Sequence, residues 1–266
     1  MKKQKVIIVT GATSGIGLAI ATMFLQAGNI VYGIARKKVE GLPFMLETAD
    51  ITNSEQIKET FNKIFEKEKR IDVLINNAGM GISGAIEHTS EQDLKNLFEV
   101  NLISQIRLCG EIIPFLRESG GGNIVNIGSL AGVIPIPFQA CYSASKAAIL
   151  NFSQALAMEI KPFNIFVSCV MPGDTKTGFT SARKKNKVMA DLNYKNRIVR
   201  SIKKMEKDEQ SGMSPQCVAK VVSSVITKKH PPLIKTVGTG NKAIVFFLKI
   251  APTSLMIRIV SSMYAK

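Results

Sequence analysis

The chain has 266 residues, 45% of them apolar, four cysteines and a formal net charge of +15. The length and apolar content fit one large globular domain, and the cysteines argue against a disulfide framework or a zinc site, because none forms a CxxC pair and no histidine cluster accompanies them. A reduced, cytoplasmic protein fits best, and its positive charge permits nucleic acid, anionic lipid or a phosphorylated cofactor as partner.

The first predicted element is a strand at residues 6–10, VIIVT. The preceding MKKQK is positively charged, as in a signal peptide, but only four apolar residues separate it from Thr10. A signal peptide has a longer apolar core, so we interpret this segment as the first strand of the fold.

Short apolar runs bounded by Gly, Asn or Pro recur along the chain and suit buried parallel strands, and segments with helical spacing lie between them. This alternation predicts a single-domain α/β fold over residues 1–266, a Rossmann-like doubly wound parallel sheet flanked by helices. Pro114 should kink its helix or mark the last turns. The expected strands are 6–10, 30–35, 42–50, 73–79, 123–129 and 165–173, and the expected helices are 15–27, 54–67, 91–118 and 141–161.

A glycine-rich turn, TGATSGIG, follows the first strand and opens the first helix. Without side chains at Gly11, Gly15 and Gly17, backbone amides can approach a pyrophosphate at the positive end of the helix. Any tight strand-to-helix turn favours glycine, but this position is the one that a dinucleotide-binding turn occupies.

The end of the second strand carries Arg36, Lys37 and Lys38. An NAD site usually has an acidic residue here, about 20 residues after the glycine turn, to bind the ribose hydroxyls. Cations suit a 2′-phosphate instead, so we expect NADP(H) as cofactor. The alternative is that this basic turn is merely solvated.

The stretch YSASK places Tyr142 and Lys146 four residues apart on an expected helix. Both side chains would lie on one helix face, a proton donor beside a cation. Alone, the pattern also suits an ordinary helix with a Tyr at its edge and a Lys in solvent.

Taken in order, these motifs resemble the short-chain dehydrogenases/reductases over roughly the first 180 residues. NNAG at 76–79 resembles the motif of that family's fourth strand, Pro172, Gly173 and Thr177 resemble its contacts to the nicotinamide carboxamide, and Asp50 lies where the family contacts adenine. By this resemblance the catalytic residues are Asn101, Ser129, Tyr142 and Lys146. With the turns described above, the expected cofactor-binding residues are Gly11, Thr13, Ser14, Gly15, Ile16, Gly17, Arg36, Lys37, Asp50, Ile51, Asn77, Tyr142, Lys146, Pro172, Gly173 and Thr177; no metal site is expected.

Reduction of a ketone creates negative charge on oxygen, and Tyr142 can supply the proton that meets it. The Lys146 cation should favour the phenolate, and in the family this lysine also holds the nicotinamide ribose. Ser129 would donate a hydrogen bond to the substrate oxygen. Asn101 would interrupt its helix and hold a water that connects Lys146 to solvent. Taken alone, Ser129 could instead satisfy backbone groups and Asn101 could be a buried helix-contact amide.

Residues 174–215 form the expected helical substrate lid, rich in Lys and Arg but also apolar. Its basic face could meet an acidic substrate tail, an anionic membrane or water. The apolar wall expected near the pocket mouth favours a lipophilic alcohol or ketone. The lid's apolar residues are Val188, Met189, Leu192, Tyr194, Ile198, Val199, Ile202 and Met205, and those of the wall are Val133, Ile134 and Phe138, beside Gln139.

The C-terminal segment, residues 240–266, is apolar but too interrupted by Lys249, Pro252 and Arg258 to span a bilayer. It could lie on a membrane, cap the pocket or form a subunit interface. Together with SPQCVAK at 214–220 it resembles the 17β-hydroxysteroid and retinol dehydrogenase branch of the family.

The resemblance therefore implies an NADP(H)-dependent oxidoreductase that interconverts a secondary alcohol and a ketone on a steroid-like or other bulky lipophilic substrate. The alternatives are a 3-oxoacyl-(acyl-carrier-protein) reductase, whose acidic carrier the basic lid could receive, and a non-catalytic NADP-binding sensor. Family habit suggests a homodimer or homotetramer through helices 91–118 and 141–161. We expect no specific nucleic-acid binding, because no recognition module is visible.

Overall fold

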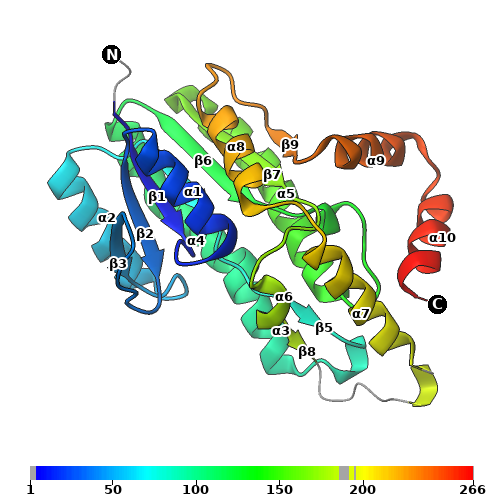
Figure 1. The fold of residues 1–266 in the computed structure, drawn as a ribbon. Coiled ribbons are helices and arrows are strands. Elements are labelled where there is room, and N and C mark those ends of the chain that lie inside the picture. The colour runs from blue at the N-terminus through cyan, green and yellow to red at the C-terminus, as the bar shows by residue number, and fades with distance from the viewer. Residues whose placement is uncertain (1–3, 186–191, 195, 266) are drawn as a thin grey trace.

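The computed structural model describes residues 4–185, 192–194 and 196–265 (Figure 1). Its centre is a parallel sheet with the strand order β3-β2-β1-β4-β6-β7-β9. The order reverses direction between β1 and β4, which is the switch point of a doubly wound fold. The fold class predicted from the sequence is confirmed.

The strands match the apolar runs of the sequence, with the greatest differences at their carboxyl ends. β1 and β2 have the predicted limits, whereas β4, β6 and β7 end before the Gly-, Asn- and Pro-containing turns that the prediction had included in the strands, and β3 is shorter than predicted at both ends. Three short strands were not predicted: β9 at the sheet edge, and β5 and β8, which pair with each other in a separate two-stranded sheet. The bounds are β1 Val6–Thr10, β2 Ile30–Ala35, β3 Met45–Thr48, β4 Val73–Asn76, β5 Ile82–Ser83, β6 Gly122–Ile127, β7 Ile165–Met171, β8 Lys184–Lys185 and β9 Ile234–Thr236.

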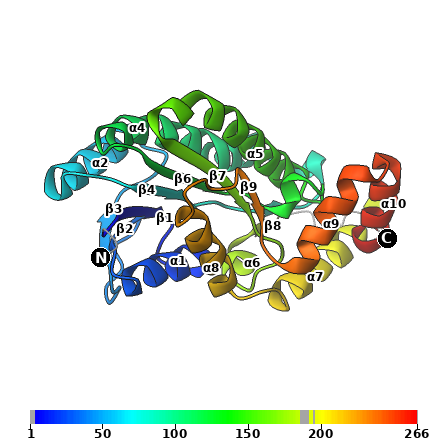
Figure 2. The same ribbon diagram turned by 90° about the horizontal axis from the view of Figure 1, so that it is seen from above.

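Helices cover both faces of the sheet (Figure 2). On one face α2 Ser54–Glu68, α4 Ser104–Glu118 and α5 Ala140–Ile160 bury side chains such as Phe61, Leu108 and Leu156 against the strands. On the other, α1 Gly15–Gln26 and α8 Pro215–Ile226 bury Phe24 and Val222. Alternate residues of the strands face the two cores, which explains why the strands read as continuous apolar runs.

The segment expected as one helix at 91–118 is divided. α3 Glu91–Phe98 leads into a π-helical segment, η2 Glu99–Ile103, before α4. Asn101 lies in this π-helical segment, so the expected interruption is confirmed. Pro114 lies inside α4, in its last turns. Single 3₁₀ turns, η1 Ile86–His88, η3 Leu130–Gly132 and η4 Lys161–Phe163, complete the body of the domain.

The lid segment, residues 174–215, contains α6 Phe179–Ala182, β8, η5 Leu192–Tyr194 and α7 Arg197–Gln210. α7 is amphipathic, as expected, with Ile198, Ile202 and Met205 buried. Tyr194 packs against this cluster, and Val199 is half-buried. Val188 and Met189 lie outside the described residues, as does the side chain of Leu192.

The chain ends in two helices, α9 Thr239–Ile250 and α10 Thr253–Tyr264, here called the C-terminal helix pair. They lie to one side of the sheet, next to α7 (Figures 1 and 2). Tyr264 donates a hydrogen bond to Asp208 Oδ2 of α7 at 2.9 Å. Within the described part of the chain, no helix combines the length and hydropathy that a membrane span requires.

Candidate active site

The glycine turn follows β1 at the switch point of the sheet. Gly11 and Gly15 have φ angles of 65° and 53°, which other residues rarely adopt. A Cβ on Gly17 would lie 2.2 Å from the Gly11 carbonyl oxygen. The turn therefore brings the start of α1 against its own backbone, and only glycine fits at its third position.

The first turn of α1 presents backbone N–H groups that the helix itself does not satisfy. Its N-cap residue, Ser14, makes no side-chain capping bond. Thr177, which begins the lid side of the site, faces Gly15, whose Cβ would lie 3.3 Å from the Thr177 Cβ. Thr13 and Ile16 belong to the same turn. This cradle fits the pyrophosphate of a dinucleotide, which binds at helix N-termini of this kind.

Asn77 ties the end of β4 to the glycine turn. Its Nδ2 donates to the carbonyl oxygens of Thr10 and Gly11 at 3.0 and 3.2 Å. Thr10 Oγ1 accepts hydrogen bonds from the N–H groups of Asn77 and Ala78 at 3.0 and 3.1 Å. Thr10 was not among the residues expected from the sequence, although a polar residue that ends an apolar strand is a usable signal.

The residues expected to contact the adenosine follow β2 and β3. Arg36 and Lys37 are exposed directly after β2. Asp50 Oδ1 accepts hydrogen bonds from the N–H and hydroxyl of Thr52 at 2.9 and 2.8 Å, so this carboxylate also caps its own turn. Ile51 is buried beneath that turn.

The turn after β7 holds Pro172 and Gly173, which were expected to face the nicotinamide. The Pro172 carbonyl oxygen accepts a hydrogen bond from Leu130 N–H at 2.9 Å, which fixes this turn beside η3. Gly173 lies against Asn241 of α9, whose Nδ2 would be 2.5 Å from a Cβ at that position. Asn241 belongs to the C-terminal segment, in which no site residue was expected from the sequence.

Tyr142 and Lys146 project from one face of α5, as the YSASK spacing predicted. Lys146 Nζ lies 6.0 Å from the centre of the Tyr142 ring, and the Ser129 hydroxyl is close enough to Tyr142 to act to lower its pKa. Ser129 Oγ also accepts from Ala131 N–H at 3.1 Å. The structure thus brings together three of the four residues of the expected tetrad.

Burial shifts the pKa values of both Lys146 and Tyr142. Lys146 is buried and donates to the Ile127 carbonyl oxygen at 2.9 Å, and desolvation lowers its pKa to about 8. Desolvation raises the pKa of Tyr142 to about 12, against smaller lowering effects of Ser129 and Arg183. We expected Lys146 to lower the tyrosine pKa, but Lys146 is not among the groups that shift it, and the loss of hydration outweighs the lowering effects of Ser129 and Arg183.

Asn101 uses its amide to hold the segment that follows NNAG. Its Oδ1 accepts from Met80 N–H at 2.8 Å, and its Nδ2 donates to the Met80 carbonyl oxygen at 2.9 Å. Nδ2 also donates to Ser145 Oγ at 3.2 Å. A Cβ on Gly79 would lie 3.3 Å from Asn101 Oδ1 and 3.8 Å from Lys146 Nζ. Asn101 is therefore close to Lys146. Its hydrogen bonds to Met80 and Ser145 are also those expected of a buried amide that holds a helix in contact, which was the alternative interpretation of this residue.

The lid segment covers Tyr142. The Phe179 ring lies 5.8 Å from the Tyr142 ring, and the Arg183 guanidinium lies 5.7 Å from the Phe179 ring. Arg183 pairs with Glu209 of α7. None of these three residues was expected in the site from the sequence; Phe179, two residues after Thr177, was the only one whose position could have indicated a role.

The expected apolar wall lies between α5 and α7. The Phe138 and Tyr194 rings are 5.8 Å apart, edge to face, and Gln139 is buried. Val133 and Ile134 are half-buried on the preceding loop. The residues of this wall therefore join the start of α5 to the lid segment.

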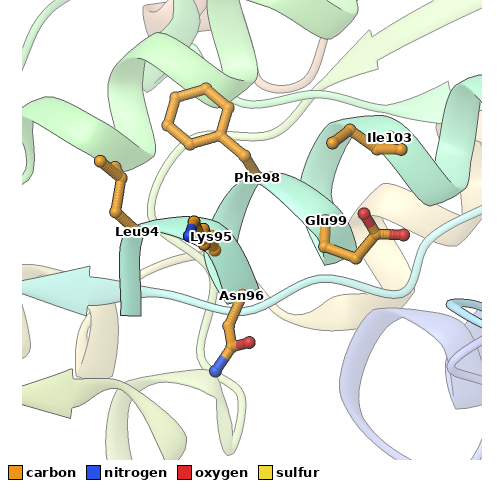
Figure 3. Close-up of a pocket in the computed structure, with 6 residues that line it drawn as sticks. All are labelled: Leu94, Lys95, Asn96, Phe98, Glu99 and Ile103. Atoms are coloured by element: carbon orange, nitrogen blue, oxygen red, sulfur yellow. The ribbon is translucent and has the colours of Figure 1, made fainter. Parts of the chain in front are cut away.

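An open pocket of about 470 Å³ lies against α3 and η2 (Figure 3). None of the expected catalytic or cofactor-binding residues lines it. Its lining residues are Leu94, Lys95, Asn96, Phe98, Glu99 and Ile103.

Comparison with known proteins agrees with this geometry. Residues 5–188 match the family model described as short chain dehydrogenase. The chain is 38% identical to a 3-ketodihydrosphingosine reductase of Bacteroides thetaiotaomicron, over 89% of this chain and 88% of that protein. It is 30% identical to retinol dehydrogenase 8 of Bos taurus, over 96% of this chain and 88% of that one.

Among solved structures, a short-chain dehydrogenase from Streptomyces avermitilis superimposes with a TM-score of 0.84 at 30% identity, covering 98% of this chain and 96% of that one. The match to the family model spans the glycine turn, NNAG and the tetrad positions. The chain therefore belongs to the short-chain dehydrogenases, and it is an oxidoreductase of that family.

Proposed function

We propose that the protein is an NADP(H)-dependent oxidoreductase that interconverts a secondary alcohol and a ketone on a bulky lipophilic substrate. The observation that carries the proposal is the grouping of Ser129, Tyr142 and Lys146 beside the glycine turn, with Thr177 opposite Gly15. A proton donor, a cation and a dinucleotide cradle together suit carbonyl reduction.

In this proposal the bound dinucleotide would supply the hydride, and side chains of the protein would supply the proton. Tyr142, held protonated by its burial, gives its hydroxyl proton to the substrate oxygen. Ser129 donates a hydrogen bond to the same oxygen. Lys146 remains charged below about pH 8, and in the family this lysine holds the nicotinamide ribose. Asn101 positions the Met80 segment beside Lys146.

The substrate class follows from the wall of Phe138 and Tyr194 and from the relatives, which include a 3-ketodihydrosphingosine reductase and a retinol dehydrogenase. Sphingoid, retinoid and steroid-like ketones all fall within it. A 3-oxoacyl-(acyl-carrier-protein) reductase is the second candidate, favoured by the basic residues of the lid segment. A non-catalytic NADP sensor is disfavoured by the presence of all four tetrad residues.

The first experiment measures NADPH oxidation at 340 nm with 3-ketodihydrosphingosine, retinal, 3- and 17-ketosteroids and a 3-oxoacyl thioester, with NADH in parallel. Turnover of at least one lipophilic ketone, with NADPH preferred, is the expected result. Activity confined to the thioester would move the assignment to the second candidate, and absence of turnover with every substrate would contradict the proposal.

Arg36 tests the choice of cofactor. Replacing it by Ala should lower kcat/KM for NADPH by about 10- to 100-fold and leave that for NADH unchanged, because the exposed guanidinium would bind only the 2′-phosphate. Lys58→Ala, an exposed cation of α2, is the matched control and should change neither value. Equal losses of kcat/KM with NADPH and with NADH would show that Arg36 does not bind the 2′-phosphate.

The C-terminal helix pair supports a membrane contact that would deliver a lipophilic substrate. Phe246 and Ile250 of α9 are 67% and 70% exposed, and Ile257 of α10 is 54% exposed. Exposed apolar helices on a chain of net charge +15 suit an anionic bilayer surface. Flotation with phosphatidylglycerol vesicles should recover the protein, and F246S/I250S should reduce recovery several-fold. Equal recovery of both proteins would contradict this contact.

Homo-oligomer formation through α4 and α5 is proposed from the exposed apolar residues Ile103 and Ile106, at and after the end of η2, and Met158. Sedimentation of the purified protein tests this directly, and a monomer at micromolar concentration would contradict it.

A further inference from the structure

Arg183 is the one residue of the basic lid segment whose charge is buried beside Tyr142 among the residues that the structure describes. Its side chain is only 1% exposed. Its Cγ packs near Gly81, and its guanidinium lies over the Phe179 ring, which contacts the Tyr142 ring. Its charge reaches the phenol, since it acts to lower the Tyr142 pKa.

One nitrogen of the Arg183 guanidinium has a hydrogen-bond partner and the other two have none among the described residues. Arg183 Nη2 donates to Glu209 Oε1, while Glu209 Oε2 accepts from Thr180 Oγ1 at 2.6 Å. Arg183 Nε and Nη1 are buried and have no hydrogen-bond partner among the described residues. Buried donors of native proteins are almost always paired, so unpaired donors beside a catalytic group indicate where a ligand atom belongs.

A lone ketone in an apolar frame would leave these donors unpaired. Its single oxygen is committed to Tyr142 and Ser129, and its carbon skeleton would desolvate the cation without compensation. A second oxygen close to the ketone would instead accept from Nε or Nη1. A carbonyl oxygen can do so, and a hydroxyl can also donate in return.

We propose that Arg183, held by Glu209, forms a subsite for an acceptor oxygen two or three bonds from the reacting carbonyl, so that the preferred substrates are lipophilic ketones with a neighbouring carbonyl or hydroxyl. This inference rests on the proposed function and narrows its substrate class. Both 3-oxoacyl compounds and 3-keto sphingoid bases have this feature, whereas a monoketosteroid or a simple long-chain ketone does not.

The test compares two isosteric ketones, ethyl 3-oxododecanoate and pentadecan-6-one, which differ in the ester oxygens. The wild type should reduce the oxo ester with a kcat/KM about 100-fold higher. Arg183→Met should abolish most of that preference by lowering only the oxo-ester value. Lys184→Met is the matched control: its cation pairs with Asp93 and is half exposed, so the preference should persist.

A second pair of substrates identifies the source of the oxygen. Reduction of 3-ketodihydrosphingosine in preference to a 3-oxododecanoyl N-acetylcysteamine thioester would assign the subsite to a hydroxyl, and the reverse order to an acyl carbonyl.

A second variant tests the geometry of the guanidinium. Arg183→Lys, which keeps the charge but not the planar fork, should retain stability and lose most of the preference for the oxo ester. Thermal melting of each variant detects unfolding, and if Arg183→Met unfolds, the Lys variant decides.

Binding separates this inference from the proposed function. If the wild type reduces neither ketone, the proposed function fails, and calorimetric binding of ethyl 3-hydroxydodecanoate against pentadecan-6-ol still decides the subsite. Tighter binding of the hydroxy ester that is lost in Arg183→Met supports it. No preference in the wild type, or an equal loss for both ligands in the variant, overturns it.

Discussion

Tyr142→Phe is expected to lower kcat for ketone reduction by about 10²- to 10⁴-fold, the range typical for loss of a general acid. The substitution removes only the hydroxyl. The ring remains available to pack against Phe179, and Lys146 keeps its hydrogen bond to the Ile127 carbonyl oxygen. Because the glycine turn and Lys146 are unchanged and Tyr142 loses only its hydroxyl, NADPH binding should remain within a few-fold of the wild type.

Three measurements distinguish a chemical effect from a structural one. They are single-turnover hydride transfer, the NADPH dissociation constant by fluorescence, and the melting temperature. Tyr32→Phe is the matched control, since Tyr32 is buried on β2 and its hydroxyl donates to Glu68 at 2.6 Å. It should retain full turnover. Substantial activity in Tyr142→Phe would exclude Tyr142 as the proton donor and revive the sensor alternative.

The sequence predicted best what depends on local pattern. Apolar runs define β1 and β2 to the residue, because buried parallel strands need side chains that are apolar on both faces. The spacing of Tyr142 and Lys146 predicted that they share a helix face, because residues four apart lie one turn apart on a helix. Asn101 was placed at a helix interruption by family resemblance, and the π-helical segment confirmed it.

The rest depends on contacts between distant segments. β9 has only three residues, including Lys235, and is specified by pairing with β7 rather than by its own pattern. Arg183 lies among lysines and reads as a solvated cation, yet Glu209 and Phe179 bury it. The Tyr142 pKa expectation failed similarly: charges can be read from a sequence, whereas desolvation depends on everything packed around the group.

Gly17→Ala is expected to weaken NADPH binding by at least about 100-fold and to destabilise the fold by about 1–3 kcal/mol, as overpacked sites do. The added Cβ would lie 2.2 Å from the Gly11 carbonyl oxygen and 2.5 Å from Asn77 Nδ2. Neither neighbour can yield cheaply. The first is backbone held in a left-handed turn, and the second is the amide that ties this turn to β4.

Gly110→Ala is the matched control, because Gly110 lies exposed within α4 and its added Cβ would meet no atom within 4 Å. Ala is favoured over Gly in a helix interior by about 1 kcal/mol, so this variant should melt slightly higher and bind NADPH normally. Titration of NADPH fluorescence and thermal melting of both variants supply the comparison. Normal NADPH binding by Gly17→Ala would mean that the dinucleotide does not depend on the close approach of α1 to its own turn, and the cradle would have to be placed elsewhere along the sheet edge.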